Sequence, residues 1–371
     1  MPAELRLLHL IDKNRLNTGS VVQMLVAARG LARRGHDVWV GSRAGGDLQA
    51  ACANAGLPFL GLPLRSSLDP ASASRLRKHL RRHQTEILHV HKGRAHGVGL
   101  VAATGLGRHP RLVVNRGVTF PLDVFNKWKF RHPRVGAVVC VADAVREVVI
   151  RSAGLDRERV HTIYGGTDCG AFDPGRADGE KVRVELGLVP EHLVIGQVSI
   201  RDWKGWPDFI AAFASIAARF PTARLLLVGC EPNSERLKID EATFDAGLAD
   251  RIETLPFRTD MPNVLAACNV VVDASRAGTG ITGTIREAMA IGRAVVATDC
   301  GGNRELVVDG EVGLVVPPRK SEALAGALVR LLEDRDLRQR LGSAARQRVA
   351  EHFSTEKRID KLEALYRQVL G

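Results

Sequence analysis

A glycine- and threonine-rich loop runs directly into a helical segment between Ser275 and Glu305, in the stretch SRAGTGITGTIREAMAIGRAVVATDCGGNRE. The unpaired N–H groups and the positive dipole end of such a helix start form a site for a phosphate or carboxylate group. Thr284 and Glu287 have the spacing of a capping box, so Glu287 either caps the helix or contacts a ligand. The segment predicts an anion site and leaves both roles of Glu287 open.

Two cations, Arg201 and Lys204, follow an apolar strand-like run in the stretch IGQVSIRDWKG. A pair of fixed cations at the end of a strand suits a diphosphate group. A basic pair in this position is otherwise most often solvated surface. The glycine-rich loop described above favours the diphosphate interpretation.

Histidines near the middle of the first half raise the hypothesis of a metal site. His89 and His91 fall on one side of a predicted strand, and His96 follows shortly after. No carboxylate cluster accompanies them, and histidines at this spacing more often pack at the end of a sheet, so we predict no metal ion. The six cysteines contain no CxxC pair, which indicates buried thiols rather than a zinc site or a disulfide framework.

The elements that must position these residues alternate between strand and helix in the first half. Ser20 and Gln23 form a potential capping box, which places the start of the first helix just after the glycine turn at Gly19. Strands are expected at residues 5–11, 37–42, 86–91, 111–115 and 136–142, and the first helix at 21–34. This alternation predicts a parallel, doubly wound sheet.

A second series of strands and helices begins after a turn-rich linker at residues 164–179. Strands are expected at 193–199, 223–228, 270–274 and 294–298, with a helix at 207–219. The last helix has one apolar face, formed by Ile359, Leu362, Tyr366 and Val369. Two facing Rossmann-like sheets bind ligands at the carboxyl ends of their strands, so the site is expected in an interdomain cleft.

Composition and charge narrow the class of protein. The 371 residues are 45% hydrophobic and 25% charged, which excludes a wholly disordered chain. No apolar run approaches the ~18 residues of a membrane-spanning helix, and the opening stretch has no basic leader, so we expect a cytoplasmic protein.

The charge is unevenly distributed along the chain. Residues 1–170 carry a net charge of +14 and residues 171–371 a net charge of −2. This asymmetry indicates an anionic partner for the first half, or an arginine-rich surface without one.

Two basic segments contribute to this charge, SASRLRKHLRRH at residues 72–83 and KWKFRH at residues 127–132. Cations beside apolar or aromatic residues suit an anionic membrane surface, which would place the protein at the inner face of the plasma membrane. In the alternative interpretation, Leu76 and Leu80 face the core and the cations simply face water.

Several motifs in their joint order resemble the retaining nucleotide-sugar glycosyltransferases of family 4. They are LARRGHDVWV, EILHVH, YGGTD at 164–168, the WKG segment, LLLVG at 225–229, EAMAIGRAVVATDCGG and GEVGLVVPP. The resemblance implies an α/β fold of the GT-B type, with two facing Rossmann-like domains. These would be an acceptor domain at 1–168, on which the helix 355–371 packs back, and a donor domain at 175–354.

The resemblance also assigns roles to single residues. Lys204 and Arg201 hold the donor diphosphate, with a shorter spacing than is common in the family, and Glu287 contacts the nucleotide ribose. Thr279 and Arg116 stand where the family usually has a glutamate and a histidine, so the neutral Thr279 cannot act as a carboxylate base, and Arg116 holds an anionic group or is merely surface. The remaining donor contacts are expected from Gly19, Ser20, Arg258, Gly280, Ile281, Thr282, Gly283 and Thr284, with Phe257 beside Arg258.

The function implied is a metal-independent, retaining transfer of a hexose-type sugar from a nucleotide diphosphate to a cell-envelope glycan or lipid-linked acceptor. No cofactor is expected beyond the nucleotide sugar, and no nucleic acid. A nucleotide-sugar epimerase or hydrolase of the same fold remains an alternative, as does a basic nucleic-acid-binding protein, although no recognition motif for nucleic acid is present. A nicotinamide dehydrogenase is disfavoured because no G-x-G-x-x-G follows the first strand.

Overall fold

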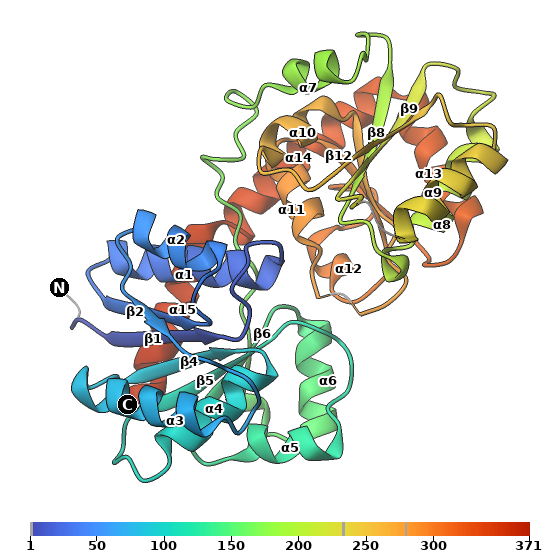
Figure 1. Cartoon of the computed structure of the whole chain (residues 1–371). Helices are drawn as coiled ribbons and strands as arrows, with labels where there is room; N and C mark the ends of the chain where they lie inside the picture. Colours follow the sequence, from blue (N-terminus) through green and yellow to red (C-terminus); the bar gives the residue numbers. More distant parts are fainter. Residues whose placement is uncertain (1–2, 232–233, 279) are drawn as a thin grey trace. The chain divides into compact units, whose positions relative to one another are not determined.

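The computed structural model describes residues 3–231, 234–278 and 280–371, and it forms two compact units (Figure 1). Unit 1 comprises Met1–Gly166 together with Thr355–Gly371, and unit 2 comprises Thr167–Ser354. Each unit has its own parallel sheet covered by helices, which confirms the predicted α/β fold class with two doubly wound domains.

Unit 1 contains a seven-stranded sheet in the order β3-β2-β1-β4-β5-β6-β7. Its strands are β1 (Arg6–Ile11), β2 (Asp37–Ser42), β3 (Phe59–Gly61), β4 (Ile87–His91), β5 (Arg111–Arg116), β6 (Val135–Cys140) and β7 (Val160–Thr162). Its helices are α1 (Gly19–Arg33), α2 (Asp47–Asn54), α3 (Pro70–Arg82), α4 (Gly93–Ala103), α5 (Val124–Arg131), α6 (Asp143–Ala153) and α15 (Thr355–Leu370). The strand order reverses between β1 and β4, which are paired in parallel.

Unit 2 contains a six-stranded sheet in the order β10-β9-β8-β11-β12-β13. Its strands are β8 (Leu193–Val198), β9 (Ala223–Val228), β10 (Ile252–Leu255), β11 (Val270–Asp273), β12 (Ala294–Thr298) and β13 (Leu314–Val316). Its helices are α7 (Gly179–Glu185), α8 (Trp206–Ile216), α9 (Ser234–Asp245), α10 (Met261–Ala267), α11 (Gly283–Ala290), α12 (Asn303–Leu306), α13 (Ser321–Glu333) and α14 (Arg335–His352). The order reverses between β8 and β11, and such switch points are where open α/β sheets bind ligands.

The central strands are buried along their length because helices cover both faces of each sheet. In β11 and β12, for example, every residue from Val270 to Asp273 and from Ala294 to Thr298 is buried. Strands buried on both faces read as near-continuous apolar runs, which is why the sequence revealed them. Each unit also has its own hydrophobic cluster, around Met24 and Tyr366 in unit 1 and around Phe209 and Val272 in unit 2.

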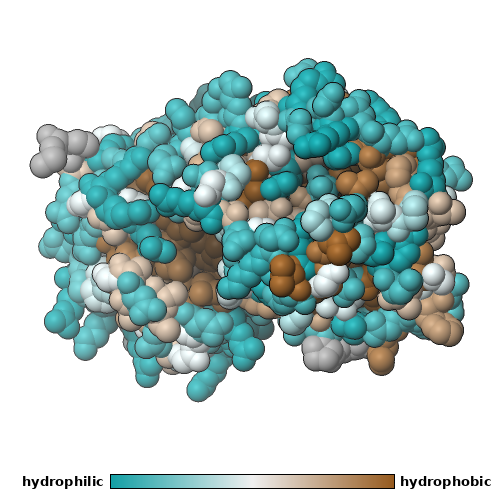
Figure 2. Space-filling view, turned by 90° about the horizontal axis from the view of Figure 1, so that it is seen from above, coloured by the Kyte–Doolittle hydropathy of each residue, from teal (hydrophilic) through white to brown (hydrophobic). Residues whose placement is uncertain are grey.

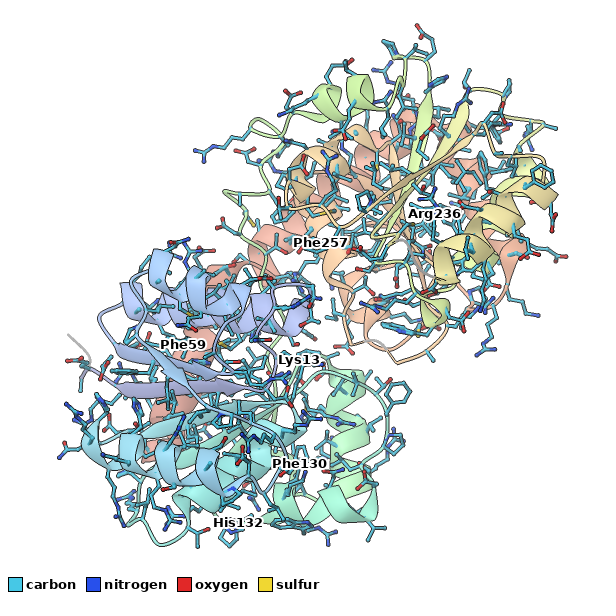
Figure 3. All side chains as sticks on the ribbon, in the orientation of Figure 1. Lys13, Phe59, Phe130, His132, Arg236 and Phe257 are labelled. Carbon is cyan, nitrogen blue, oxygen red and sulfur yellow. The ribbon has the colours of Figure 1, made fainter. Side chains whose placement is uncertain are left out.

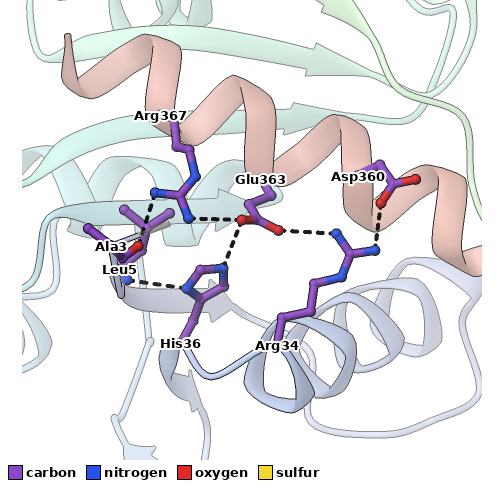
Figure 4. Close-up of polar contacts among 7 residues, drawn as sticks. All are labelled: Ala3, Leu5, Arg34, His36, Asp360, Glu363 and Arg367. Atoms are coloured by element: carbon purple, nitrogen blue, oxygen red, sulfur yellow. Dashed lines mark hydrogen bonds and ion pairs between the residues drawn. The ribbon is translucent and has the colours of Figure 1, made fainter. Parts of the chain in front are cut away.

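The last helix, α15, belongs to unit 1 and packs against α1. Ile359, Leu362 and Tyr366 are buried, which confirms that the predicted apolar face lies in a core. Gly30 of α1 permits a close approach, since a Cβ there would lie 2.0 Å from Cδ1 of Ile359. Figure 4 shows the polar edge of this contact, where Arg34 donates to Asp360 at 2.6 Å.

The predicted capping box of Ser20 and Gln23 is wrong. The N-cap of α1 is Thr18, whose side chain makes no capping hydrogen bond. The Gln23 side chain instead exchanges two hydrogen bonds of 2.8 Å with the backbone of Gly166. A peptide group satisfies the donor and the acceptor of the amide together, whereas a capping box would use only the acceptor.

The apolar face of the first basic segment is buried, as the alternative interpretation expected. Ala73, Leu76 and Leu80 of α3 are buried, so its apolar face lies in the core, while three of its cations are exposed, Arg75, Lys78 and Arg81. In α5, Phe130 is buried and Trp128 is 51% exposed. Figure 2 shows hydrophilic residues over most of the visible surface. Within the described ranges, no helix has both the length and the apolar character needed to cross a bilayer.

Candidate active site

Lys204 lies at the switch point of the unit 2 sheet because a short turn brings it back against β11. After β8 the chain forms a single 3-10 turn, Asp202–Lys204, which ends at Gly205 with φ +70°. A Cβ on Gly205 would lie 2.0 Å from the carbonyl oxygen of Ala274. Glycine is therefore required twice here, for the left-handed backbone and for the close approach, and Lys204 is placed beside the end of β11.

The partner of Lys204 is Asp273, the last residue of β11. The two side chains form a buried ion pair with Nζ and Oδ1 3.2 Å apart, and the residues are 7% and 3% exposed. Burial alone would raise the pKa of Asp273, but the Lys204 ammonium and three hydrogen-bond donors outweigh it and hold the pKa below the ordinary value. Asp273 is therefore a charged carboxylate within the protein interior.

Three further side chains bind the same carboxylate. Ser275 Oγ donates to Oδ1 at 2.8 Å, and Thr282 Oγ1 and Asn303 Nδ2 donate to Oδ2 at 2.9 and 2.8 Å. Asn303 also accepts a hydrogen bond from the Thr282 backbone N–H with its Oδ1, at 3.3 Å. Asp273 thus connects the turn after β8, the end of β11, the start of α11 and the start of α12.

Helix α11 begins at Gly283 with Thr282 as its N-cap, so the predicted capping box of Thr284 and Glu287 is wrong. The Thr282 hydroxyl donates to the Asp273 carboxylate and makes no capping hydrogen bond. The first N–H groups of a helix have no acceptor within the helix, and here they start beside the Lys204 and Asp273 pair.

The loop residues predicted to contact the donor lie just before this helix. The backbone carbonyl of Gly280 accepts from the Gly302 N–H at 2.9 Å, Ile281 is half-buried, and Thr279 falls outside the described residues.

Glu287 lies in the second turn of α11 and is half-buried. Burial raises the pKa of its carboxyl to about 7, although the adjacent Arg286 guanidinium acts in the opposite direction. The carboxyl therefore titrates near neutral pH, where it accepts hydrogen bonds when ionised and donates one when protonated.

The other predicted cations of unit 2, Arg201 and Arg258, differ in how far their side chains are already engaged by neighbouring residues. Arg201 caps the 3-10 turn with its backbone, and its side chain is exposed. Arg258 is held by Glu185 and Asp260, with separations of 2.5 and 2.8 Å. These carboxylates raise the pKa of the Arg258 guanidinium, and a ligand would compete with both of them. Phe257, labelled in Figure 3, is 54% exposed.

The predicted site residues of unit 1 lie at the carboxyl edge of its own sheet. Gly19 and Ser20 form the start of α1, which follows β1, and Arg116 is the last residue of β5. The Arg116 guanidinium donates to the carbonyl of Phe120, and burial lowers its pKa. Its Nε is buried and has no hydrogen-bond partner among the described residues.

Two histidines of the metal hypothesis, His89 and His91, form a buried cluster with His9, which sequence reasoning missed, whereas His96 packs against the Phe130 ring. His9 Nδ1 and His91 Nε2 are 3.2 Å apart, and His89 Nδ1 lies 2.6 Å from the Tyr366 hydroxyl. The rings of His89 and His91 are nearly parallel at a centroid distance of 4.3 Å. One ring nitrogen from each of His9, His89 and His91 lies within 4.8 Å of the others, a spacing at which they could hold a metal ion. The absence of a metal stays a prediction.

Comparison with known proteins decides the family. Residues 18–170 match the model of Glycosyltransferase Family 4, and residues 190–334 match that of Glycosyl transferases group 1. Alpha-D-kanosaminyltransferase of Streptomyces kanamyceticus is 31% identical over 270 residues, which are 71% of this chain and 68% of the relative. The chain belongs to the glycosyltransferases that these two models describe, family 4 and group 1. The mannosyltransferase of lipopolysaccharide core biosynthesis from Rhizobium leguminosarum is 29% identical over 78% of this glycosyltransferase and 80% of that protein.

Solved structures agree on the fold. A glycosyltransferase from Rickettsia africae has a TM-score of 0.89 at 20% identity and covers 99% of both chains. The Anabaena protein HepE in complex with UDP has a TM-score of 0.86 at 24% identity and covers 98% of this chain and all of its own. The glycosyltransferase therefore has the GT-B fold.

Asp273, Ser275 and Asn303 are the site residues that sequence reasoning missed in this glycosyltransferase. One signal was present, because an acidic residue ends the otherwise apolar run VVVDAS. A charge inside a strand buried on both faces requires a partner. Asn303 gave no comparable signal, since it lies 30 residues away in the sequence.

Proposed function

We propose that this enzyme transfers a sugar from a nucleoside diphosphate to a hydroxyl group of a cell-envelope glycan or lipid-linked acceptor, with retention of configuration and without a metal ion. The proposal rests on one observation: Lys204 and the start of α11 meet at the switch point of the unit 2 sheet, through Asp273. A cation beside a helix N-terminus is suited to bind a diphosphate.

Relatives support the chemical class of donor and acceptor. HepE has been solved with UDP-glucose, and an Escherichia coli relative, 25% identical, is a galactosyltransferase named for UDP-Gal and GlcNAc-diphosphoundecaprenol. A phosphatidyl-myo-inositol mannosyltransferase of Mycolicibacterium smegmatis is 26% identical. Their names favour an acceptor that is a glycan or a lipid of the cell envelope.

The chemical step breaks the bond between the anomeric carbon and the diphosphate oxygen. Lys204, Arg201 and the amides of Gly283 and Thr284 neutralise the negative charge that develops on the leaving diphosphate, which is electrostatic stabilisation of the transition state. The acceptor oxygen bonds to the anomeric carbon from the face that the diphosphate leaves, and its proton passes to a diphosphate oxygen. Ionised Glu287 accepts hydrogen bonds from the ribose hydroxyls.

Unit 1 is proposed to receive the acceptor. Residues 1–170 carry a net charge of +14, which suits a phosphorylated or lipid-linked glycan. We extend the proposal to adsorption on the cytoplasmic face of the plasma membrane through α3 and residues 127–132. Because the apolar face of α3 is buried, this adsorption would be electrostatic, aided by Trp128.

The decisive experiment offers the purified enzyme a panel of UDP-, GDP- and ADP-sugars, with and without a lipid-linked glycan extract. We expect turnover only with acceptor, unchanged activity in excess EDTA, and a product whose anomeric coupling in NMR matches the donor. Turnover without acceptor would indicate an epimerase or hydrolase instead. Loss of activity in EDTA, restored by a divalent cation, would contradict metal independence.

A further inference from the structure

The Asp273 carboxylate is saturated by hydrogen bonds from four different segments of unit 2. Each of its oxygens accepts two bonds, Oδ1 from Lys204 and Ser275, and Oδ2 from Thr282 and Asn303. A carboxylate oxygen has two lone pairs, so no acceptor capacity is left for a ligand. Asp273 is therefore placed to organise its neighbours and not to touch a substrate.

The Lys204 ammonium, in contrast, keeps capacity for a ligand. Among the residues that the structure describes, it donates one hydrogen bond, to Asp273 Oδ1, and it lies 4.9 Å from the centre of the Trp203 ring. An ammonium has three N–H donors, so it can bind Asp273 and phosphate oxygens together. The lysine need not leave the aspartate for a diphosphate to bind.

We infer that Asp273 is a positioning residue, which fixes the Lys204 ammonium and the N-cap Thr282 of α11 in one rigid frame around the donor diphosphate. This inference rests on the proposed function. Its physical basis is preorganisation, since donors that already point at the developing charge need no rearrangement during the reaction. Asp273 also forms the buried ion pair that compensates the charge of the Lys204 ammonium.

The test is Asp273→Asn, which keeps the shape of the side chain and removes the charge. The probe is whichever of UDP, GDP and ADP the unmodified enzyme binds, measured by calorimetric titration between pH 7 and 9. Without its counter-charge the buried Lys204 holds its proton less tightly, so the affinity of the variant should fall with rising pH at least tenfold more than that of the unmodified enzyme. In the double variant with Lys204→Met this additional pH dependence should disappear.

A matched control is Asp173→Asn, which breaks the ion pair with Arg346 in the same unit at the same separation of 3.2 Å but on the surface. Its pH dependence should coincide with that of the unmodified enzyme. Glu287 is present in every variant, so its own titration cancels in the comparison. Equal pH dependence of Asp273→Asn and the unmodified enzyme would overturn the inference alone, whereas no binding of any of the three probes by the unmodified enzyme would overturn the proposed function and the inference with it.

A milder pair of variants tests the same frame if Asp273→Asn does not fold. Thr282→Val removes the hydroxyl that binds Asp273 Oδ2, while Thr282→Ser keeps it. We expect kcat to fall about tenfold in the valine variant, with little change in KM, and to return to within about twofold of the original with serine. Equal kcat values for valine and serine would contradict the positioning role.

Discussion

Lys204 combines two roles, because its charge both stabilises the fold and is proposed to bind the donor. Lys204→Ala leaves the Asp273 carboxylate buried without its cation. We expect the free energy of unfolding to fall by about 3 kcal/mol, as is typical when one partner of a buried ion pair is removed. Turnover should fall by about 100-fold or more.

Chemical denaturation and steady-state kinetics measure the two effects separately. Lys238→Ala is the control, since Lys238 is an exposed lysine of the same unit. Turnover that persists in Lys204→Ala would remove this lysine from the mechanism, whatever the change in stability.

The carboxyl of Glu287 makes stability depend on pH. Its pKa is about 7 in the folded chain, above the ordinary value of 4.5. Between these values the folded chain binds more protons than the unfolded chain, so this group lowers stability as pH rises from about 5 to 7. The glutamine of Glu287→Gln does not titrate, so the variant lacks this loss of stability. As pH rises from about 5 to 7, its melting temperature should therefore increase relative to that of the unmodified enzyme. If the difference in melting temperature between the two proteins is the same at pH 5 and pH 8, the pKa of the Glu287 carboxyl is not raised.

At the scale of elements, Gly205 determines where the backbone places Lys204, the cation that is proposed to bind the donor. Gly205→Ala would force a left-handed residue and a clash with the backbone oxygen of Ala274. Gly247→Ala is the matched control, because Gly247 has φ +63° and open space around a Cβ. We expect the control to cost about 1 kcal/mol and Gly205→Ala to cost more and to weaken nucleotide binding. Thermal melting and titration with nucleotide check this, and equal losses in both variants would argue against the close approach.

The sequence predicted the interior elements well. The strands at 37–42, 223–228 and 294–298 have the bounds that the apolar runs indicated, because burial on both faces leaves a continuous pattern. The strands β3, β7, β10 and β13 were missed, since three or four residues are too few for a periodic signal. The first capping box was wrong because Gly166, 143 residues along the chain, binds the Gln23 amide. The second was wrong because α11 begins at Gly283, with Thr282 as its N-cap. The same limitation hid Asn303, whose place depends on the tertiary fold.

At the scale of the whole molecule, the uneven charge predicts electrostatic adsorption to anionic membranes. We expect unit 1 to bring the enzyme to vesicles containing anionic lipid at low salt, with release at high salt, because the apolar residues of α3 are buried. Sedimentation with anionic and neutral vesicles measures this. Binding to neutral vesicles, or binding that survives high salt, would contradict an adsorption driven by charge.

The two cores predict different tolerance to truncation. Removing residues 355–371 exposes the pocket in unit 1 that Leu362 and Tyr366 fill, so unit 1 should lose cooperative unfolding. Unit 2, expressed as residues 167–354, should keep its own melting transition. Circular dichroism of the two fragments checks this, and a cooperative transition of unit 1 in the truncated chain would contradict it.

The membership of α15 in unit 1 has a consequence for biosynthesis. A ribosome releases the chain from its first residue onward, so the earliest 166 residues must wait for the final 17 before their hydrophobic cluster is complete. Unit 2 is continuous in the chain and can finish folding first. The half that is made first is therefore the half that completes its core last, and until then part of its hydrophobic cluster stays exposed and prone to aggregation.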